Sequence, residues 1–71
     1  MKIKVGDLVR VSSVGEDDEL GSIVQVEEKT GLFSEKYAIL ETSTYVHVLC
    51  GGEIKVFDWE DYEFEVIDEA G

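Results

Sequence analysis

The sequence predicts an all-β domain of five or six short antiparallel strands, closed into one small barrel with almost no helix. Two observations predict this class. Short runs rich in β-branched residues alternate apolar with polar side chains, and glycine or charged turns separate these runs. A barrel also hides the strand edges that would otherwise pair with other chains. Because 71 residues leave room for one domain, we expect residues 1–71 to form a single unit.

The first two strands are each introduced by a glycine. Residues 6–13 (GDLVRVSS) alternate well enough for a first strand, and the charged residues 15–19 (GEDDE) form a loop after it. Residues 20–28 (LGSIVQVEE) form the second strand. Lys29-Thr30-Gly31 is expected to end that strand.

The middle of the chain contains one ambiguous run and one clear strand. Residues 37–40 (YAIL) are short and apolar, and the β-branched residues after them favour a strand over a helix. Residues 45–50 (YVHVLC) are clearer, because alternate positions separate two faces. One face of this strand holds Val46, Val48 and Cys50.

The last third of the chain predicts a hairpin, a turn and a closing strand. Gly51-Gly52 is a strong two-residue hairpin signal, and residues 54–57 return from it. Residues 58–62 (DWEDY) have the pattern of one short 3₁₀ turn capped by Asp58, and residues 64–67 form the closing strand. The inward positions of the strands predict a core of Val9, Val11, Val24, Val26, Val46, Val48, Val56, Phe64 and Val66.

Both ends of the chain resemble small SH3-like barrels. The resemblance rests on VGDLVRV at residues 5–11, GSIVQV at 21–26 and DWEDYEFEVI at 58–67, and it leaves residues 30–44 unmatched. Such barrels occur as KOW-type modules, as accessory subunits of photosystems and reductases, and as short uncharacterised proteins of tailed phages, to which this chain is most similar. The resemblance implies that the 3₁₀ turn borders a ligand groove. KOW modules usually present basic residues to RNA, and this chain departs from that pattern.

The charge balance determines which partners are expected. Seventeen acidic residues oppose six basic ones, which gives a formal net charge of −11. This sign argues against binding to nucleic acid or to an anionic membrane, and for a protein partner with a basic surface. The single cysteine, the lack of a long apolar run and the lack of a signal peptide after Met1 predict a complete, cytoplasmic protein.

Catalytic, cofactor and metal sites are not expected. His47 and Cys50 are the candidates for nucleophilic chemistry, but a spacing of three on one strand places them on opposite faces. Cys50 is expected to be a buried structural thiol and His47 to lie on a half-exposed face. The acidic residues 16–19 lack the spacing of a calcium-binding loop and are expected to be solvated.

The segment from Asp58 to Glu63 is the predicted interaction site. Its aromatic residues alternate with acids, and Trp and Tyr are common anchors of interfaces. The alternative for Trp59 is that it plugs one end of the barrel core, because large aromatic side chains dominate burial in small cores. The predicted protein-binding residues are Asp58, Trp59, Glu60, Asp61, Tyr62 and Glu63.

The predicted function is that of a non-enzymatic, acidic binding module for a protein partner, such as a phage accessory or host-modulating protein in the host cytoplasm. The alternative is a nucleic-acid mimic, whose carboxylates imitate phosphates and block a DNA- or RNA-binding protein. The two hypotheses differ in their charge maps. Mimicry needs ordered rows of carboxylates on one face, whereas a generic module scatters them.

Overall fold

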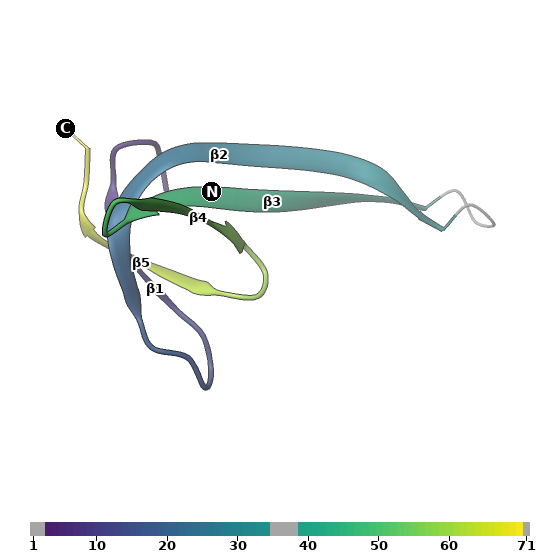
Figure 1. Cartoon of the computed structure of the whole chain (residues 1–71). Coiled ribbons are helices and arrows are strands. Elements are labelled where there is room, and N and C mark those ends of the chain that lie inside the picture. The colour runs from purple at the N-terminus through teal and green to yellow at the C-terminus, as the bar shows by residue number, and fades with distance from the viewer. Residues whose placement is uncertain (1–2, 35–38, 71) are drawn as a thin grey trace.

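The computed structural model describes residues 3–34 and 39–70, which form one antiparallel sheet of five strands (Figure 1). The strands lie in the spatial order β4-β3-β2-β1-β5. Their bounds are β1 (Leu8–Ser12), β2 (Glu19–Ser34), β3 (Ile39–Cys50), β4 (Glu53–Asp58) and β5 (Glu63–Asp68). The predicted all-β class is therefore confirmed, with five strands. The described residues contain no helix long and apolar enough to cross a membrane.

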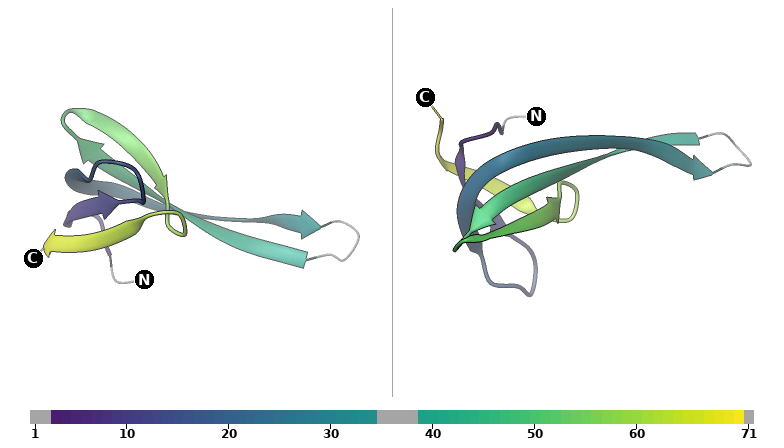
Figure 2. Two further views of the ribbon diagram at one scale, coloured as in Figure 1. Left: turned by 90° about the horizontal axis from the view of Figure 1, so that it is seen from below. Right: turned by 45° about the horizontal axis from the view of Figure 1, so that its top comes forward.

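The sheet curls around the core but does not close into the predicted barrel (Figure 2). β4 and β5 are its two edges, and a turn at residues 59–62 joins them. Between these edges, the ring centroids of Phe57 in β4 and Phe64 in β5 lie 6.4 Å apart, nearly perpendicular to each other. Aromatic side chains therefore fill the space that a backbone ladder, with strands roughly 4.8 Å apart, would need.

β2 and β3 are longer than predicted and extend beyond the rest of the sheet (Figure 1). β2 pairs with β1 at residues 19–22, and β3 pairs with β4 at residues 45–50. Within the described part of the chain, residues 28–34 and 39–44 pair only with each other, and we call this ribbon the arm. The prediction that Lys29-Thr30-Gly31 ends the second strand is wrong, because these residues stay in register with residues 41–43.

The run predicted at residues 37–40 falls partly outside the described residues. Tyr37 and Ala38 are not described, whereas Ile39 and Leu40 belong to β3. The clear strand predicted at residues 45–50 is the part of β3 that joins the body of the sheet.

The core occupies the inner, concave face of the sheet. The predicted residues that are fully buried are Val9, Val11, Val46 and Val48. Those that pack half-buried against them are Val26, Phe64 and Val66. Cys50 is buried, as expected. The core also contains three buried residues that the sequence did not point to, namely Ile3, Ile23 and Phe57.

Val24 was predicted to be in the core but is 38% exposed. The register of β2 against β3 shifts between Ile23 and Gln25, which indicates a β-bulge. A bulge inserts one extra residue and reverses the alternation that follows it. Ile23 therefore takes the inner position before the bulge, Val26 takes the next one, and Val24 faces outward.

The prediction that Val56 lies in the core is also wrong, because this residue is 54% exposed. Phe57 lies opposite Val46 in the β3–β4 ladder, and Val56 lies opposite His47. Directly opposed residues share a face of the sheet. Phe57 therefore joins Val46 inside, whereas Val56 joins His47 outside.

Glycine is required at two places in the body. Gly21 lies so close to β3 that a Cβ there would collide with the carbonyl oxygen of Leu49 and lie 2.7 Å from Val48 Cγ1. In the β3–β4 hairpin, Gly51 and Gly52 have φ angles of +57° and +88°. Two positive φ angles in succession match a type I′ turn, which confirms the predicted hairpin.

The buried carboxylate of Asp7 connects segments near both ends of the chain. Its Oδ1 accepts a hydrogen bond from the backbone N–H of Ala70 at 2.8 Å, and its Oδ2 accepts one from that of Lys4 at 3.0 Å. These hydrogen bonds, that from Ala70 above all, lower the pKa of Asp7, although burial opposes the shift. The bonds hold the segment after β5 against the turn before β1, and these two segments lie on the same side of the sheet (Figure 2).

Candidate functional site

The turn between β4 and β5 is held by Asp58. Its Oδ1 accepts a hydrogen bond from the backbone N–H of Glu60 at 2.9 Å, and its carbonyl oxygen accepts one from Asp61 N at 3.2 Å. The backbone N–H of Trp59 donates to the carbonyl oxygen of Thr44 at 2.9 Å, which ties the turn to the root of the arm. The role of Asp58 is therefore to fix the turn that presents the residues after it.

The aromatic residues of this segment pack on the core. Trp59 stacks on Phe64 with ring centroids 5.1 Å apart and an interplanar angle of 14°. Tyr62 meets Phe57 edge to face at 4.9 Å and 73°. Both Trp59 and Tyr62 are half-buried. This arrangement gives Trp59 a packing role, and it holds the ring of Tyr62 in one place while leaving part of it accessible.

An open hollow of about 410 Å³ lies beside the turn. It forms because the pairing of Ser12 with Glu63 brings the end of β1 and the start of β5 together. Its walls are therefore the loop after β1 and the turn before β5. The residues that line it are Ser12, Ser13, Val14, Glu60, Asp61, Tyr62 and Glu63.

A second open hollow, of about 420 Å³, adjoins the first. Ser13 and Tyr62 line both, so Tyr62 stands between the two. The residues that line the second hollow are Val11, Ser13, Glu16, Asp17, Glu19, Lys55, Phe57 and Tyr62. Five carboxylates that are not paired with Lys55 thus surround one tyrosine, and they are Glu16, Asp17, Glu60, Asp61 and Glu63.

The lysine of the second hollow is neutralised by a neighbour. Lys55 Nζ lies 2.8 Å from Glu19 Oε1, and this hydrogen bond raises the pKa of Lys55. The negative charge of Glu16 raises the pKa of Tyr62. At neutral pH Lys55 therefore stays charged and paired, Tyr62 stays neutral, and the remaining charge of the hollows is negative.

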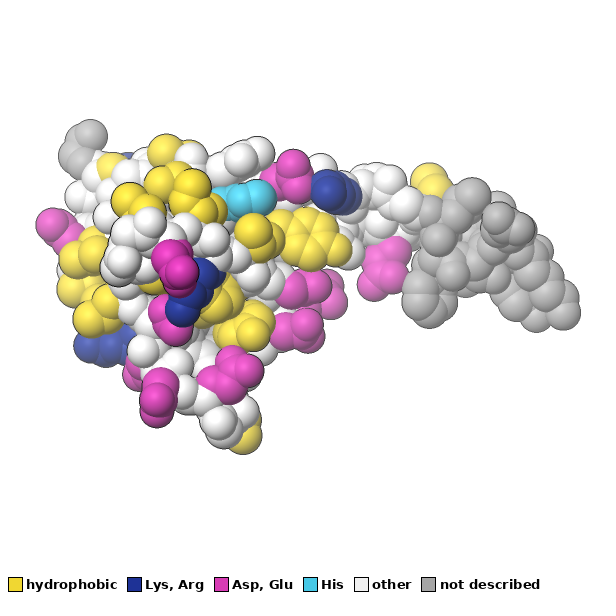
Figure 3. All heavy atoms as spheres, in the orientation of Figure 1, with side chains coloured by type: hydrophobic (Ala, Val, Ile, Leu, Met, Phe, Trp, Pro, Cys, Tyr) yellow, Lys and Arg dark blue, Asp and Glu magenta, His cyan; other side chains and the backbone are white. Residues whose placement is uncertain are grey.

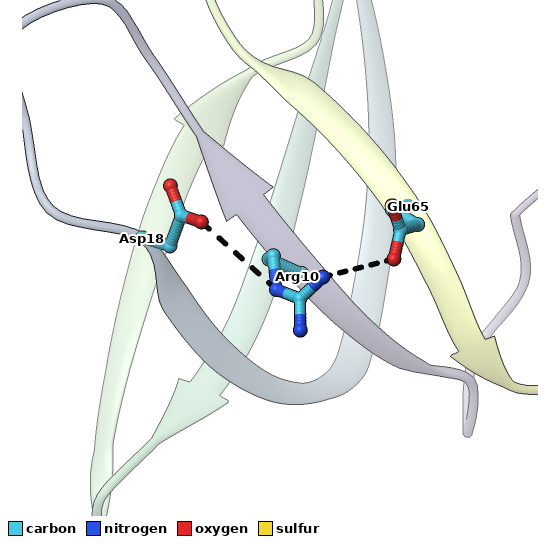
Figure 4. A network of polar contacts seen from close by, with 3 residues as sticks. All are labelled: Arg10, Asp18 and Glu65. Atoms are coloured by element: carbon cyan, nitrogen blue, oxygen red, sulfur yellow. Dashed lines mark hydrogen bonds and ion pairs between the residues drawn. The ribbon is translucent and has the colours of Figure 1, made fainter.

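Arg10, the basic residue of β1, is engaged on the other face of the sheet (Figure 4). Its Nη1 lies 3.0 Å from Glu65 Oε1, and its Nε lies 3.9 Å from Asp18 Oδ2. All three side chains are exposed, so these pairs contribute little to stability. They do place Arg10 away from the two hollows, because Arg10 alternates with the buried Val9 and Val11.

The structure brings together four of the six predicted site residues. Glu60, Asp61, Tyr62 and Glu63 line the first hollow. Asp58 and Trp59 lie outside both linings and instead fix and support the turn, as their hydrogen bonds and stacking show.

Sequence reasoning missed the opposite wall, which the loop between β1 and β2 supplies. Glu16 and Asp17 of that loop were expected only to face water, yet they line the second hollow. The signal that would have found them is the pairing of the first strand with the last. This pairing places the loop after β1 beside the turn before β5.

The candidate nucleophiles lie outside the hollows. Cys50 is buried on the inner face, and burial raises the pKa of its thiol. His47 alternates with the buried Val46 and Val48, so it lies on the outer face, as the spacing predicted. Among the described residues, no group of three or more His, Cys, Asp or Glu side chains is placed to hold a metal ion.

Comparison of this chain with protein-family models, with curated proteins and with solved structures found no match.

Proposed function

We propose that this protein is a non-enzymatic binding module of the SH3-like kind, whose two adjoining hollows receive a basic segment of a protein partner. The observation that carries the proposal is the set of five carboxylates around Tyr62 that form no ion pair with another described residue, contributed by two segments far apart in the sequence. The resemblance to SH3-like barrels supports it, since the 3₁₀ turn of such barrels borders their ligand groove.

The chemistry of the hollows favours a partner that carries Lys or Arg. Carboxylates on both walls offer charge-assisted hydrogen bonds to cationic side chains. The half-buried ring of Tyr62 offers an apolar surface between them, on which the stem of a Lys or the plane of an Arg packs. The net charge of −11 adds long-range attraction, so we expect association to be faster at low salt.

The net charge also opposes binding to nucleic acid or to an anionic membrane, and under the proposal the protein binds neither. The single cysteine favours a reducing compartment, and the proposed place of action is the cytoplasm. The chain's resemblance to short proteins of tailed phages supports an accessory or host-modulating role in the host cytoplasm.

A peptide titration with charge-matched variants tests the proposal. The probe is a fluorescently labelled decapeptide that alternates Lys, Arg and Ala, and the control peptide carries Glu in place of the cations. Asp61→Lys reverses one charge in the first hollow, and Glu41→Lys makes the same change on the exposed arm. We expect Asp61→Lys to weaken binding of the basic peptide roughly tenfold and Glu41→Lys to weaken it by less than about twofold.

Equal weakening by the two variants would mean that binding follows net charge alone, and it would refute a specific site. Tyr62→Phe keeps the ring against Phe57 and removes the hydroxyl, so it separates packing from hydrogen bonding at the same position.

Fluorescence anisotropy with labelled DNA and RNA tests the proposal that the protein does not bind nucleic acid. Saturable binding below about 10 μM, tighter than ordinary non-specific association, would contradict it.

A further inference from the structure

The outer, convex face of the sheet is apolar over four strands. Leu49 of β3 lies between Ile54 of β4 and Ser22 of β2, and Ser22 in turn lies opposite Leu8 of β1. Neighbouring positions extend this row on the same face. The apolar residues that make up what we call the outer face are Leu8, Leu20, Val24, Leu49, Ile54 and Val56, all of them exposed.

Over β2, β3 and β4, the positions that separate these side chains in the ladders carry Ser22, Gln25 and His47, none of them acidic. At the β1 end of the face, Arg10 lies opposite Leu20 and pairs with Asp18 and Glu65, and Asp68 lies opposite Leu8. The Nε2 atom of His47 is itself buried and has no hydrogen-bond partner within the described part of the chain. Apolar side chains gather over β3 and β4 in the space-filling view, whereas several acidic side chains lie lower on the body (Figure 3). The outer face thus differs sharply from the acidic hollows.

The arm is the second unpartnered feature. Its two strands pair only with each other, and the side chain of Leu40 is 66% exposed. The far half of the arm carries little charge, because residues 30–34 (TGLFS) contain no ionisable side chain and residues 39–42 (ILET) contain one acid. An isolated two-stranded ribbon is marginally stable in water. The arm therefore gains stability from any apolar surface that covers it.

We propose that the arm of one copy of this chain lies across the outer face of a second copy, and that the exchange is reciprocal. The occupant is a second copy because the arm needs an apolar surface to cover it and the outer face needs a partner to cover its apolar side chains. One is a broad apolar face, and the other is an extended, weakly charged ribbon that is able to follow a convex surface.

The charge of the chain excludes most other contacts between copies. At a net charge of −11, two copies repel each other wherever their carboxylates meet. The edges of the sheet are blocked too, because Lys55 points inward from the middle of β4 and acids alternate along β5. The part of the outer face over β2, β3 and β4 and the far half of the arm, in which Glu41 is the one acid among the described residues, are surfaces on which two copies meet with few opposing carboxylates.

The available area suits a dimer of moderate affinity. The six side chains of the outer face expose on the order of 500 Å², which is the size of the largest apolar patches on monomers, often functional ones. Two such patches, each covered once, approach the roughly 1,000 Å² that a specific interface needs. Salt screens the repulsion between copies, so the dimer should tighten as salt rises, whereas the basic partner proposed above should bind less tightly.

Sedimentation velocity on the full chain tests this inference, from about 5 to about 200 μM protein at low and at high salt. Ile54→Lys disrupts the outer face and Leu40→Lys disrupts the arm. Val5→Lys, at a residue exposed to a similar degree outside both surfaces, is the matched control. Each Lys lowers the net negative charge, so added repulsion does not explain a loss of association. Circular dichroism shows that each variant is folded.

We expect a dimer that strengthens with salt, that is retained in Val5→Lys, and that weakens at least roughly tenfold in each of the other two variants. Mixing Ile54→Lys with Leu40→Lys restores one of the two contacts, because one variant keeps its arm and the other keeps its outer face. A fluorescent label on one variant follows this mixed dimer. A monomer at every concentration and salt would overturn the proposal. Dimerisation that survives Leu40→Lys, or a mixture that fails to associate, would overturn it as well.

Discussion

The body of the sheet consists of β1, β4, β5 and the parts of β2 and β3 that pair with them. β2 and β3 continue from the body into the arm, but different interactions hold them extended in the two regions. Val46 and Thr42 are four residues apart in β3, yet Val46 is inaccessible and Thr42 is exposed. In the body, each strand is covered on its inner face by side chains from other strands. In the arm, the extended strands are stabilised locally by their pairing with each other and by the β preference of residues such as Thr30 and Thr42. The comparison teaches that strand length here does not follow from burial.

Glycine substitutions are expected to give the largest difference between the body and the arm in the change of the free energy of unfolding. Gly21→Ala in the body places a Cβ against the backbone of Leu49 and within 2.7 Å of Val48, so β2 and β3 must separate. We expect a loss of about 3 kcal/mol in the free energy of unfolding, as for overpacked cores. In the arm, a Cβ at Gly31 meets nothing within 4 Å, so Gly31→Ala should be neutral or slightly stabilising. Urea denaturation measures both, and equal losses would contradict the comparison.

Truncation of apolar side chains is expected to give the next largest difference in stability loss between the body and the arm. Val46→Ala removes two methyl groups from a fully buried position and leaves a cavity, at a cost of about 2 kcal/mol. Leu40→Ala in the arm removes a side chain that is mostly exposed, and it should cost less than about 0.5 kcal/mol in the monomer. Thermal unfolding at low protein concentration checks both values. A larger loss for Leu40→Ala would mean that the arm has a core of its own.

Asp7→Asn is expected to have a smaller effect that depends on pH. Hydrogen bonds from Ala70 and Lys4 lower the pKa of Asp7 from its ordinary value of 3.8. The unfolded chain therefore binds this proton more tightly than the folded one. The stability contributed by the carboxylate is present above that ordinary pKa and is lost as the pH falls through the lower folded value. Asp7→Asn should lower the melting temperature at pH 7, and the gap to the parent should narrow near pH 3. A gap that does not change with pH would contradict the role of the charge.

The smallest effect is expected in the arm, at the cross-strand pair of Thr30 and Thr42. Their hydroxyl groups lie 3.0 Å apart in an exposed position. Thr42→Ala should change global stability by less than about 0.5 kcal/mol, yet it should speed amide hydrogen exchange at residues 28–31 and 40–44. Exchange rates in the body should stay unchanged. Faster exchange throughout the chain would show that the arm and the body unfold as one unit.

The fold class followed from features that depend only on neighbouring residues. Alternation identified the buried faces of β1 and β3, and Gly51-Gly52 identified the hairpin because both residues need positive φ angles. Burial of Val24 and Val56 was predicted wrongly because the bulge at β2 and the register of β4 depend on pairing between strands. The length of the arm could not be predicted either, since Lys29-Thr30-Gly31 has the composition of a turn and is kept extended by its partner strand.

Only one of the two walls of the candidate site, the turn before β5, could be predicted from the sequence. Residues 60–63 were found because aromatic and acidic side chains alternate there in sequence. Glu16 and Asp17 were missed as a second wall because the pairing of β1 with β5 joins segments more than fifty residues apart. Asp58 and Trp59 were predicted as binding residues, with a place in the core as the alternative for Trp59, and their hydrogen bonds and stacking show that they also fix the turn.

The position of β5 next to β1 has a consequence for synthesis of the protein on the ribosome. β1 emerges about fifty residues before β5, its second partner strand. Until β5 leaves the exit tunnel, Val9 and Val11 lack the cover of Phe64 and Val66, and Asp7 lacks its bond from Ala70. The hairpins of β2, β3 and β4 involve only nearby residues and are able to form earlier, since local contacts close fastest. Folding should therefore complete after translation of β5, and chains truncated before residue 63 should be substrates for proteolysis.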